Sequence, residues 1–184
     1  MKKIIVGLVF LALSAGPGFC SAISVGNWYS DYWDGPVETT LTDGPNYTGS
    51  SGTVLLDPGS APWTFTGPAV LFVTDILIDG DQFEVFDNGV EVGTTSTPVN
   101  DGSNCGDDPV NCGGGDWSQG TFDFGTGPHS ITMTIIAEST GSTGEGNGAF
   151  ELTTTPEPAS FGLMGLGCLG LVLGRRRFRR KGEI

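Results

Sequence analysis

Basic residues are absent from most of this chain. Its 184 residues include eight Lys and Arg, and all eight lie at the two ends: Lys2 and Lys3, then six residues between Arg175 and Lys181. Phosphate groups are neutralised by Lys and Arg, so the long middle part is not expected to bind nucleic acid. The same absence disfavours direct binding to an anionic lipid surface and leaves no arginine that could clamp an anionic substrate.

The acidic residues are therefore left without counter-charges. Residues 23–153 hold 19 of the 21 Asp and Glu, since only Glu157 and Glu183 lie outside this range, and the formal charge of this part is −19. Self-repulsion at this density destabilises a folded state unless cations or geometry offset it. The plain interpretation is an acidic surface suited to a salty exterior; the alternative is a specific role that depends on cations.

Histidine is scarce as well, which limits the possible catalysis. His129 is the only histidine and follows Pro128 at a predicted turn, so a Ser-His-Asp arrangement has a single candidate base. No phosphate-binding loop or cofactor fingerprint is present. A pair of carboxylates could hydrolyse glycosides, but so many acidic residues single out no pair. We therefore predict that the protein is not an enzyme and keep a secreted carbohydrate-active hydrolase as the alternative.

The chain has four cysteines, of which only two lie in its middle part. Cys20 falls near the N-terminal apolar segment and Cys168 in the C-terminal one. Cys105 and Cys112 are predicted to form a disulfide, because nearby cysteines in a polar loop usually pair in an oxidising compartment. Closing so short a loop stabilises a protein by about 2–3 kcal/mol. Zinc is the rival interpretation, but it needs two further ligands and His129 is the only histidine.

The first 22 residues have the pattern of a secretory signal peptide. Lys2 and Lys3 supply the positive region, residues 4–13 are apolar, and Cys20-Ser21-Ala22 offers small residues for cleavage. We therefore expect export, with the mature chain starting at residue 23.

The last thirty residues consist of three parts in a fixed order. A proline-framed acid precedes an apolar run at residues 159–174, and a basic cluster follows. The run is short against the roughly 20 residues that cross a bilayer as a helix, but flanking arginines extend its span. The basic cluster predicts a cytoplasmic C-terminus. The short acidic motif is Pro156, Glu157 and Pro158, and the basic stop is Arg175, Arg176, Arg177, Arg179 and Arg180.

These three parts resemble the PEP-CTERM sorting domain of Gram-negative bacteria, over residues 154–184. The resemblance implies passage through the export machinery, an inner-membrane anchored precursor, and recognition by an exosortase. It further implies cleavage near the Pro-Glu-Pro motif and delivery to the cell surface or the exterior. Such proteins are associated with exopolysaccharide, which makes a structural or adhesive role in the matrix the predicted function. A permanent single-pass anchor that tethers a surface binding module is the alternative.

Residues 23–153 are predicted to form one all-β domain, a β-sandwich of jelly-roll type. Short runs of β-branched and aromatic residues recur between turn signals, and residues 87–89 are an Asp-Asn-Gly hairpin turn. Residues 126–128 are a second predicted turn. Residues 97–117 and 138–147 are long Gly-rich loops. The predicted strands are 25–29, 37–41, 53–56, 63–66, 69–78, 81–86, 90–94, 120–124, 130–137 and 149–152.

The segment at residues 80–89, Gly-Asp-Gln-Phe-Glu-Val-Phe-Asp-Asn-Gly, is similar to the strand-and-turn signature of CUB-like β-sandwiches. The resemblance implies a calcium ion held by Asp75 and Asp81, with a third acid from a later loop, for which Glu145 is the candidate. Calcium takes six to eight oxygen ligands, which a carboxylate-rich body can supply. In the alternative interpretation Asp75, Asp79 and Asp81 are solvated turn residues. Calcium is thus the one candidate cofactor.

Aromatic residues gather near the start of the mature chain. Exposed aromatics stack on sugar rings, whereas buried ones fill a sandwich core, and we favour the core because aromatic side chains are usually buried. The set comprises Trp28, Tyr29, Tyr32 and Trp33, with Trp63 and Trp117 elsewhere.

Overall fold

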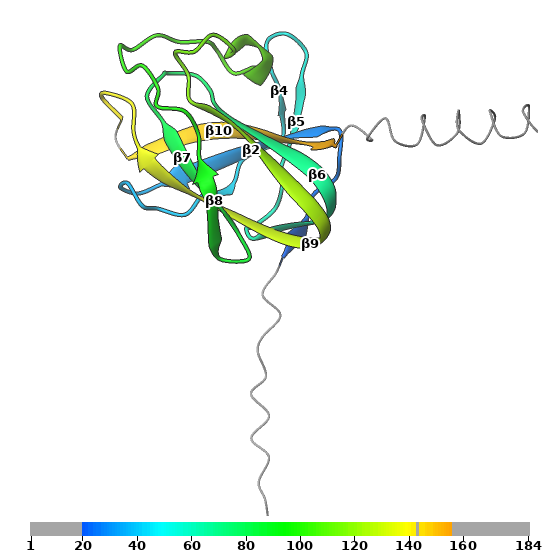
Figure 1. Ribbon diagram of the computed structural model, residues 1–184. Helices are drawn as coiled ribbons and strands as arrows, with labels where there is room; N and C mark the ends of the chain where they lie inside the picture. Colours follow the sequence, from blue (N-terminus) through cyan, green and yellow to red (C-terminus); the bar gives the residue numbers. More distant parts are fainter. Residues whose placement is uncertain (1–19, 143, 156–184) are drawn as a thin grey trace, which may run out of the picture.

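The computed structural model in Figure 1 describes residues 20–142 and 144–155. The sorting motif at 156–158, the apolar run at 159–174 and the basic stop lie outside these ranges, as does most of the predicted signal peptide. Among the described residues, no helix has the length and apolar character needed to cross a membrane. The last two residues of the predicted signal peptide, Ser21 and Ala22, form a short strand that pairs with Trp63 and Thr64.

The described residues form an all-β structure, as the sequence predicts. Ten strands share one sheet, whose main path runs β4-β5-β2-β10-β6-β9-β7-β8, and a single turn of 3-10 helix, η1, lies in the long loop. The jelly-roll assignment within this class stays a prediction. The strands are β1 (Ser21–Ala22), β2 (Asn27–Asp34), β3 (Thr42–Asp43), β4 (Tyr47–Thr48), β5 (Val54–Leu56), β6 (Trp63–Asp75), β7 (Gln82–Asp87), β8 (Val90–Thr94), β9 (Gln119–Ala137) and β10 (Glu145–Thr154), and η1 is Pro109–Asn111.

Two strands are much longer than predicted. β6 and β9 run unbroken for 13 and 19 residues and pair antiparallel along most of β6, with an irregularity at residue 68. The turn predicted at residues 126–128 is therefore wrong. Gly67 lies opposite Gly127, where a Cβ added at Gly67 would collide with the carbonyl oxygen of Gly125. Glycine there lets the two backbones bend together.

The long strands fold the sheet over on itself (Figure 1). The first half of β9 pairs with β6, and the second half pairs with β7. Three strands separate β2 from β7 along the path, yet Trp33 of β2 packs edge-on against Phe83 of β7 at 5.6 Å between ring centres. The core lies between the two layers. Its largest fully buried side chains include Trp33, Trp63, Phe83, Phe150, Leu71, Ile131, Met133 and Ile135.

The segment after β2 crosses between the two layers. The predicted strand at 37–41 is reduced to one β-bridge, between Thr40 and Thr134. The Leu41 amide also donates to the carbonyl oxygen of Met133 at 2.9 Å, and the Leu41 side chain is fully buried. This segment therefore covers the free side of the second half of β9.

Candidate functional site

Three neighbouring strands bring two aspartates into one row of the sheet. Gly148 of β10 pairs with Asp31 of β2 on one side and with Asp75 of β6 on the other. Directly paired residues project to the same face, so both carboxylates lie on the core side with only a glycine between them. A Cβ at Gly148 would lie 2.5 Å from Oδ1 of Asp31. The glycine therefore leaves the space that the Asp31 carboxylate occupies.

A third carboxylate reaches this row from the turn that follows β6. The amide of Asp81 donates to Oδ2 of Asp75 at 3.2 Å, which brings the two residues into contact. Oδ1 of Asp81 accepts a hydrogen bond from the Ser139 amide at 2.8 Å. Asp31 and Asp75 are fully buried and Asp81 is 4% exposed. We call Asp31, Asp75 and Asp81 the acidic cluster.

The acidic cluster has few hydrogen-bond donors. Both carboxylate oxygens of Asp31 and Oδ1 of Asp75 are buried with no hydrogen-bond partner. A buried charge without a partner is strongly unfavourable. Burial raises the pKa of Asp31 to about 8, although the nearby Gly148 amide acts to lower it. Burial and the charge of Asp81 raise the pKa of Asp75 to about 9. Burial also raises the pKa of Asp81 to about 6, together with the charges of Glu138 and Asp79.

The structure thus brings together two of the three predicted calcium ligands. Asp75 and Asp81 touch, whereas Glu145 opens β10 opposite Asp34 and accepts a hydrogen bond from the Tyr32 hydroxyl at 3.0 Å. The interpretation of Asp75, Asp79 and Asp81 as solvated turn residues is wrong, because all three are buried. Asp79 accepts hydrogen bonds from the amides of Asp101 and Gly102 at 3.1 and 2.9 Å.

Asp31 was not predicted as a site residue. It alternates with Tyr29 and Trp33, so its side chain points to the same face as these two buried rings. An acid at an inward position of an aromatic strand was the available signal. The predicted strand ended at residue 29, which hid the alternation. Among the described residues, no group of three or more His, Cys, Asp or Glu could hold a metal ion.

An open cleft lies beside the acidic cluster. It has a volume of about 480 Å³, and Asp81 forms part of its wall together with residues 76–78 and 139–142. Tyr32, Glu145 and Asn147 line the side formed by β2 and β10. Ile78 is 44% exposed and gives the cleft one apolar surface. The cleft therefore connects Asp81 to solvent.

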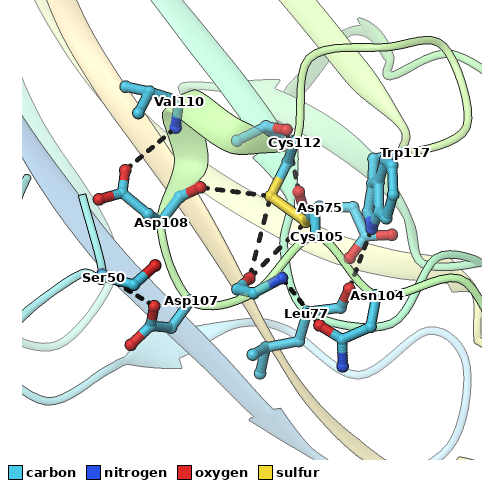
Figure 2. The surroundings of a disulfide bond; sticks show 12 residues. Ser50, Asp75, Leu77, Asn104, Cys105, Asp107, Asp108, Val110, Cys112 and Trp117 are labelled. Carbon is cyan, nitrogen blue, oxygen red and sulfur yellow. Dashed lines mark hydrogen bonds between the residues drawn. A yellow bond between two sulfur atoms is a disulfide. The ribbon is translucent and has the colours of Figure 1, made fainter.

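The disulfide loop supports the segment between Asp75 and Asp81. Cys105 and Cys112 are joined, which confirms the predicted disulfide (Figure 2). The amide of Leu77 donates to Gly106 at 2.9 Å, and Leu77 accepts from Cys105 at 3.0 Å through its carbonyl oxygen. The ring N–H of Trp117 donates to the same carbonyl at 3.1 Å (Figure 2). Leu77 has a positive φ of 66°, so these three bonds hold an unusual backbone conformation in place.

His129 is engaged in a structural contact at another part of the sheet. Its Nδ1 lies 2.8 Å from Oδ2 of Asp87, and its Nε2 lies 3.1 Å from the Gly125 carbonyl oxygen. The ring also stacks on Phe65. Burial acts to lower the pKa of His129, but the hydrogen bonds to Asp87 and Gly125 and the charge of Asp87 together raise it. With both nitrogens occupied, the imidazole is poorly placed to serve as a general base.

Three of the six aromatic residues singled out in the sequence belong to the core. Tyr29, Trp33 and Trp63 are buried, as predicted. Tyr32 is only half-buried and faces the cleft. Trp28 packs edge-on against Phe72 at 5.9 Å on the other face of the sheet.

Comparison with protein-family models finds the PEP-CTERM protein-sorting motif at residues 154–180. No curated protein matches the chain significantly, and no solved structure does. The motif confirms the resemblance drawn from the tail, whereas the CUB-like character of residues 80–89 stays a prediction.

Proposed function

Because the PEP-CTERM motif indicates an exported protein that an exosortase processes, we propose that the folded domain is a non-enzymatic module of the cell surface or extracellular matrix. Its role is structural or adhesive, and its partner is exopolysaccharide. The observation that carries the adhesive role is the open cleft at one end of the sheet.

The cleft has the chemistry that a sugar chain requires. Sugar rings need an apolar surface as well as donors and acceptors for their hydroxyl groups. The exposed Ile78 side chain supplies the first, and Tyr32, Asn147 and the hydroxyl groups at residues 139–142 supply the second. Calcium assists this role, since a body with a formal charge of −19 repels an acidic polysaccharide unless cations lie between them.

A carbohydrate-active hydrolase is the second candidate, and one observation favours it. Asp81 lines the cleft and has a pKa raised to about 6, which suits a general acid near neutral pH. Glu145 would be the second carboxylate of a glycosidase pair. We rank this function lower because Asp81 already has structural contacts. It accepts a hydrogen bond from the Ser139 amide and contacts Asp75.

Two matched variants test the adhesive role. Ile78→Ser removes the apolar surface of the cleft, whereas Val90→Ser removes a more exposed valine from β8 on another part of the molecule. Cosedimentation with exopolysaccharide from the producing cells should show retention reduced about fivefold for Ile78→Ser and unchanged for Val90→Ser. Equal retention of the two variants would contradict the proposal. Release of new reducing ends from the polysaccharide, lost in Asp81→Asn, would establish the hydrolase instead.

Processing is tested separately on the secreted protein. Mass spectrometry of the surface form should show a chain that ends near residue 158 and lacks the basic stop. A P156A/E157A/P158A variant should keep its tail and stay with the membrane fraction. An intact C-terminus on the surface form of the unaltered protein would favour the permanent anchor.

A further inference from the structure

We propose that the signal peptidase cleaves this chain between Cys20 and Ser21, so that the exported protein begins with strand β1. The sequence alone places the first mature residue at Ile23, and that choice would discard both residues of β1. The inference rests on export, which the sorting motif indicates, and it is independent of what the cleft binds.

Two candidate cleavage sites lie two residues apart in the sequence. A signal peptide is cut after a short motif that has small residues at its first and last positions. Cys20-Ser21-Ala22 fits this pattern, and Gly18-Phe19-Cys20 fits it as well, since the middle position accepts a larger side chain. The motif therefore does not distinguish the two sites, and the fold has to.

Strand β1 pairs with a part of β6 that β10 does not reach. β9 pairs with one side of β6 from its first residue, whereas β10 pairs with the other side only from Ala69. β1 lies parallel to the first two residues of β6, on the side that β10 leaves free. The Ser21 amide donates to the Pro62 carbonyl oxygen at 3.2 Å, and the Ile23 amide donates to that of Thr64 at 2.9 Å. β1 is thus an integral strand of the sheet.

The Ser21 side chain also has its own place in the fold. A Cβ added at Gly59 would collide with the Ser21 hydroxyl oxygen, so the glycine leaves the space that this side chain occupies. The fully buried Trp63 holds the same turn, because its ring N–H donates to the Gly59 carbonyl oxygen at 2.7 Å. Ser21 therefore contacts a turn of the domain as well as β6, and a chain that begins at Ile23 loses both contacts.

The charge of the new amino terminus favours the same cleavage site. Cleavage leaves an α-ammonium group on the first residue, and burial of an unpaired charge is unfavourable. Ile23 is 5% exposed and belongs to the core cluster, so its ammonium would lie at the edge of the core. Ser21 is only half-buried, which leaves its ammonium in contact with water.

Amino-terminal sequencing of the exported protein, together with its intact mass, tests the proposal directly. The expected sequence is Ser-Ala-Ile-Ser-Val, which starts at residue 21. Any other first residue, Ile23 included, would overturn the proposal.

Two matched variants of the precursor separate the cleavage sites. Gly18→Tyr places a bulky side chain at the first position of the proposed motif, and Ala22→Tyr places one at the last position of the alternative motif. Gly18→Tyr should abolish the chain that begins at Ser21, whereas Ala22→Tyr should still be cut after Cys20. The opposite pattern would contradict the proposal.

Deletion of Ser21 and Ala22 from the precursor tests whether β1 belongs to the mature fold. The Gly18-Phe19-Cys20 motif stays intact, and cleavage after it gives a chain that begins at Ile23. This chain lacks β1, and its melting temperature should be about 3–6 °C lower than that of the unaltered protein. If the unaltered protein already begins at Ile23, the two mature chains are identical and melt together, which would refute the proposal. Should the variant not be exported, the amino-terminal sequence of the unaltered protein decides.

Discussion

Asp31 and Asp108 are both fully buried aspartates, yet their surroundings are opposite. Asp108 precedes η1 and accepts hydrogen bonds from the Ser51 amide at 3.0 Å, from the Ser51 hydroxyl, and from the amides of Thr53 and Val110 at 3.3 Å each. Asp31 lies in the middle of β2, and its two oxygens have no partner. The Asp108 carboxylate thus organises a loop, whereas the Asp31 carboxylate is buried without such hydrogen bonds.

The comparison shows that hydrogen-bond donors, more than burial itself, decide the protonation state of a buried aspartate. Burial acts to raise the pKa of Asp108, but the bonds from Ser51, Thr53 and Val110 lower it to about 2. At Asp31 burial prevails, and the pKa rises to about 8. The several donors around Asp108 make it a structural residue, whereas at Asp31 only the Gly148 amide opposes the effect of burial.

The largest expected effect is a dependence of stability on pH when divalent cations are removed. The folded-state pKa values of Asp31 and Asp75 lie above the ordinary value of 3.8 for an aspartate. The folded protein therefore holds more protons than the unfolded chain between about pH 4 and pH 8–9, and stability falls as pH rises through this window. The slope approaches about 1.4 kcal/mol per pH unit for each group.

Urea unfolding in EDTA between pH 5 and pH 8 measures this slope. The Asp108 carboxylate behaves in the opposite way: its folded pKa is lowered, so its stabilisation is present above pH 4 and disappears as pH falls toward 2. If the free energy of unfolding in EDTA does not change with pH, or if it increases toward pH 8, Asp31 and Asp108 do not differ in the way proposed.

Replacing Asp108, the aspartate that accepts several hydrogen bonds, should have the next largest effect. Asp108→Ala leaves buried donors of the 50–53 loop and of η1 without an acceptor, and we expect a loss of about 3 kcal/mol in the free energy of unfolding. Urea unfolding of the exported protein in calcium gives this value. Asp31→Asn, measured in EDTA, should move in the other direction. Destabilisation of equal size in both variants would mean that the two carboxylates have the same role.

The disulfide gives the smallest of the three effects. A C105S/C112S variant reopens a loop of eight residues, and the chain-entropy model assigns about 2.5 kcal/mol to its closure. Urea unfolding measures this change, and an unaltered free energy of unfolding in the double variant would contradict it.

Local patterns predicted the hairpin of β7 and β8 well. Asn88 and Gly89 have φ angles of 51° and 77°, the positive values that their sequence favours. The same patterns failed at the long strands, because Gly67 and Pro128 read as turn residues. In the structure Thr66 pairs with Pro128 and Gly67 with Gly127, so the breakers lie opposite each other at one bend. This bend follows from the pairing of β6 with β9, and the sequence of either segment alone does not predict it.

The acidic cluster was predicted in part for a similar reason. Asp75 and Asp81 are six residues apart, and a turn between strands brings them together. Asp31 reaches them only through β10, which pairs with β2 and β6 at the same glycine. Contacts that depend on three strands far apart in sequence lie beyond periodicity and spacing.

The position of β10 also determines how the domain would bear a mechanical load. This strand ends at Thr154, where the sorting segment begins, and lies between β2 and β6 with partners on both sides (Figure 1). A pull on a tethered C-terminus along the strand axis loads its hydrogen bonds together in shear, instead of opening them one at a time as at an edge strand. The chain thus leaves the fold from a central strand with partners on both sides.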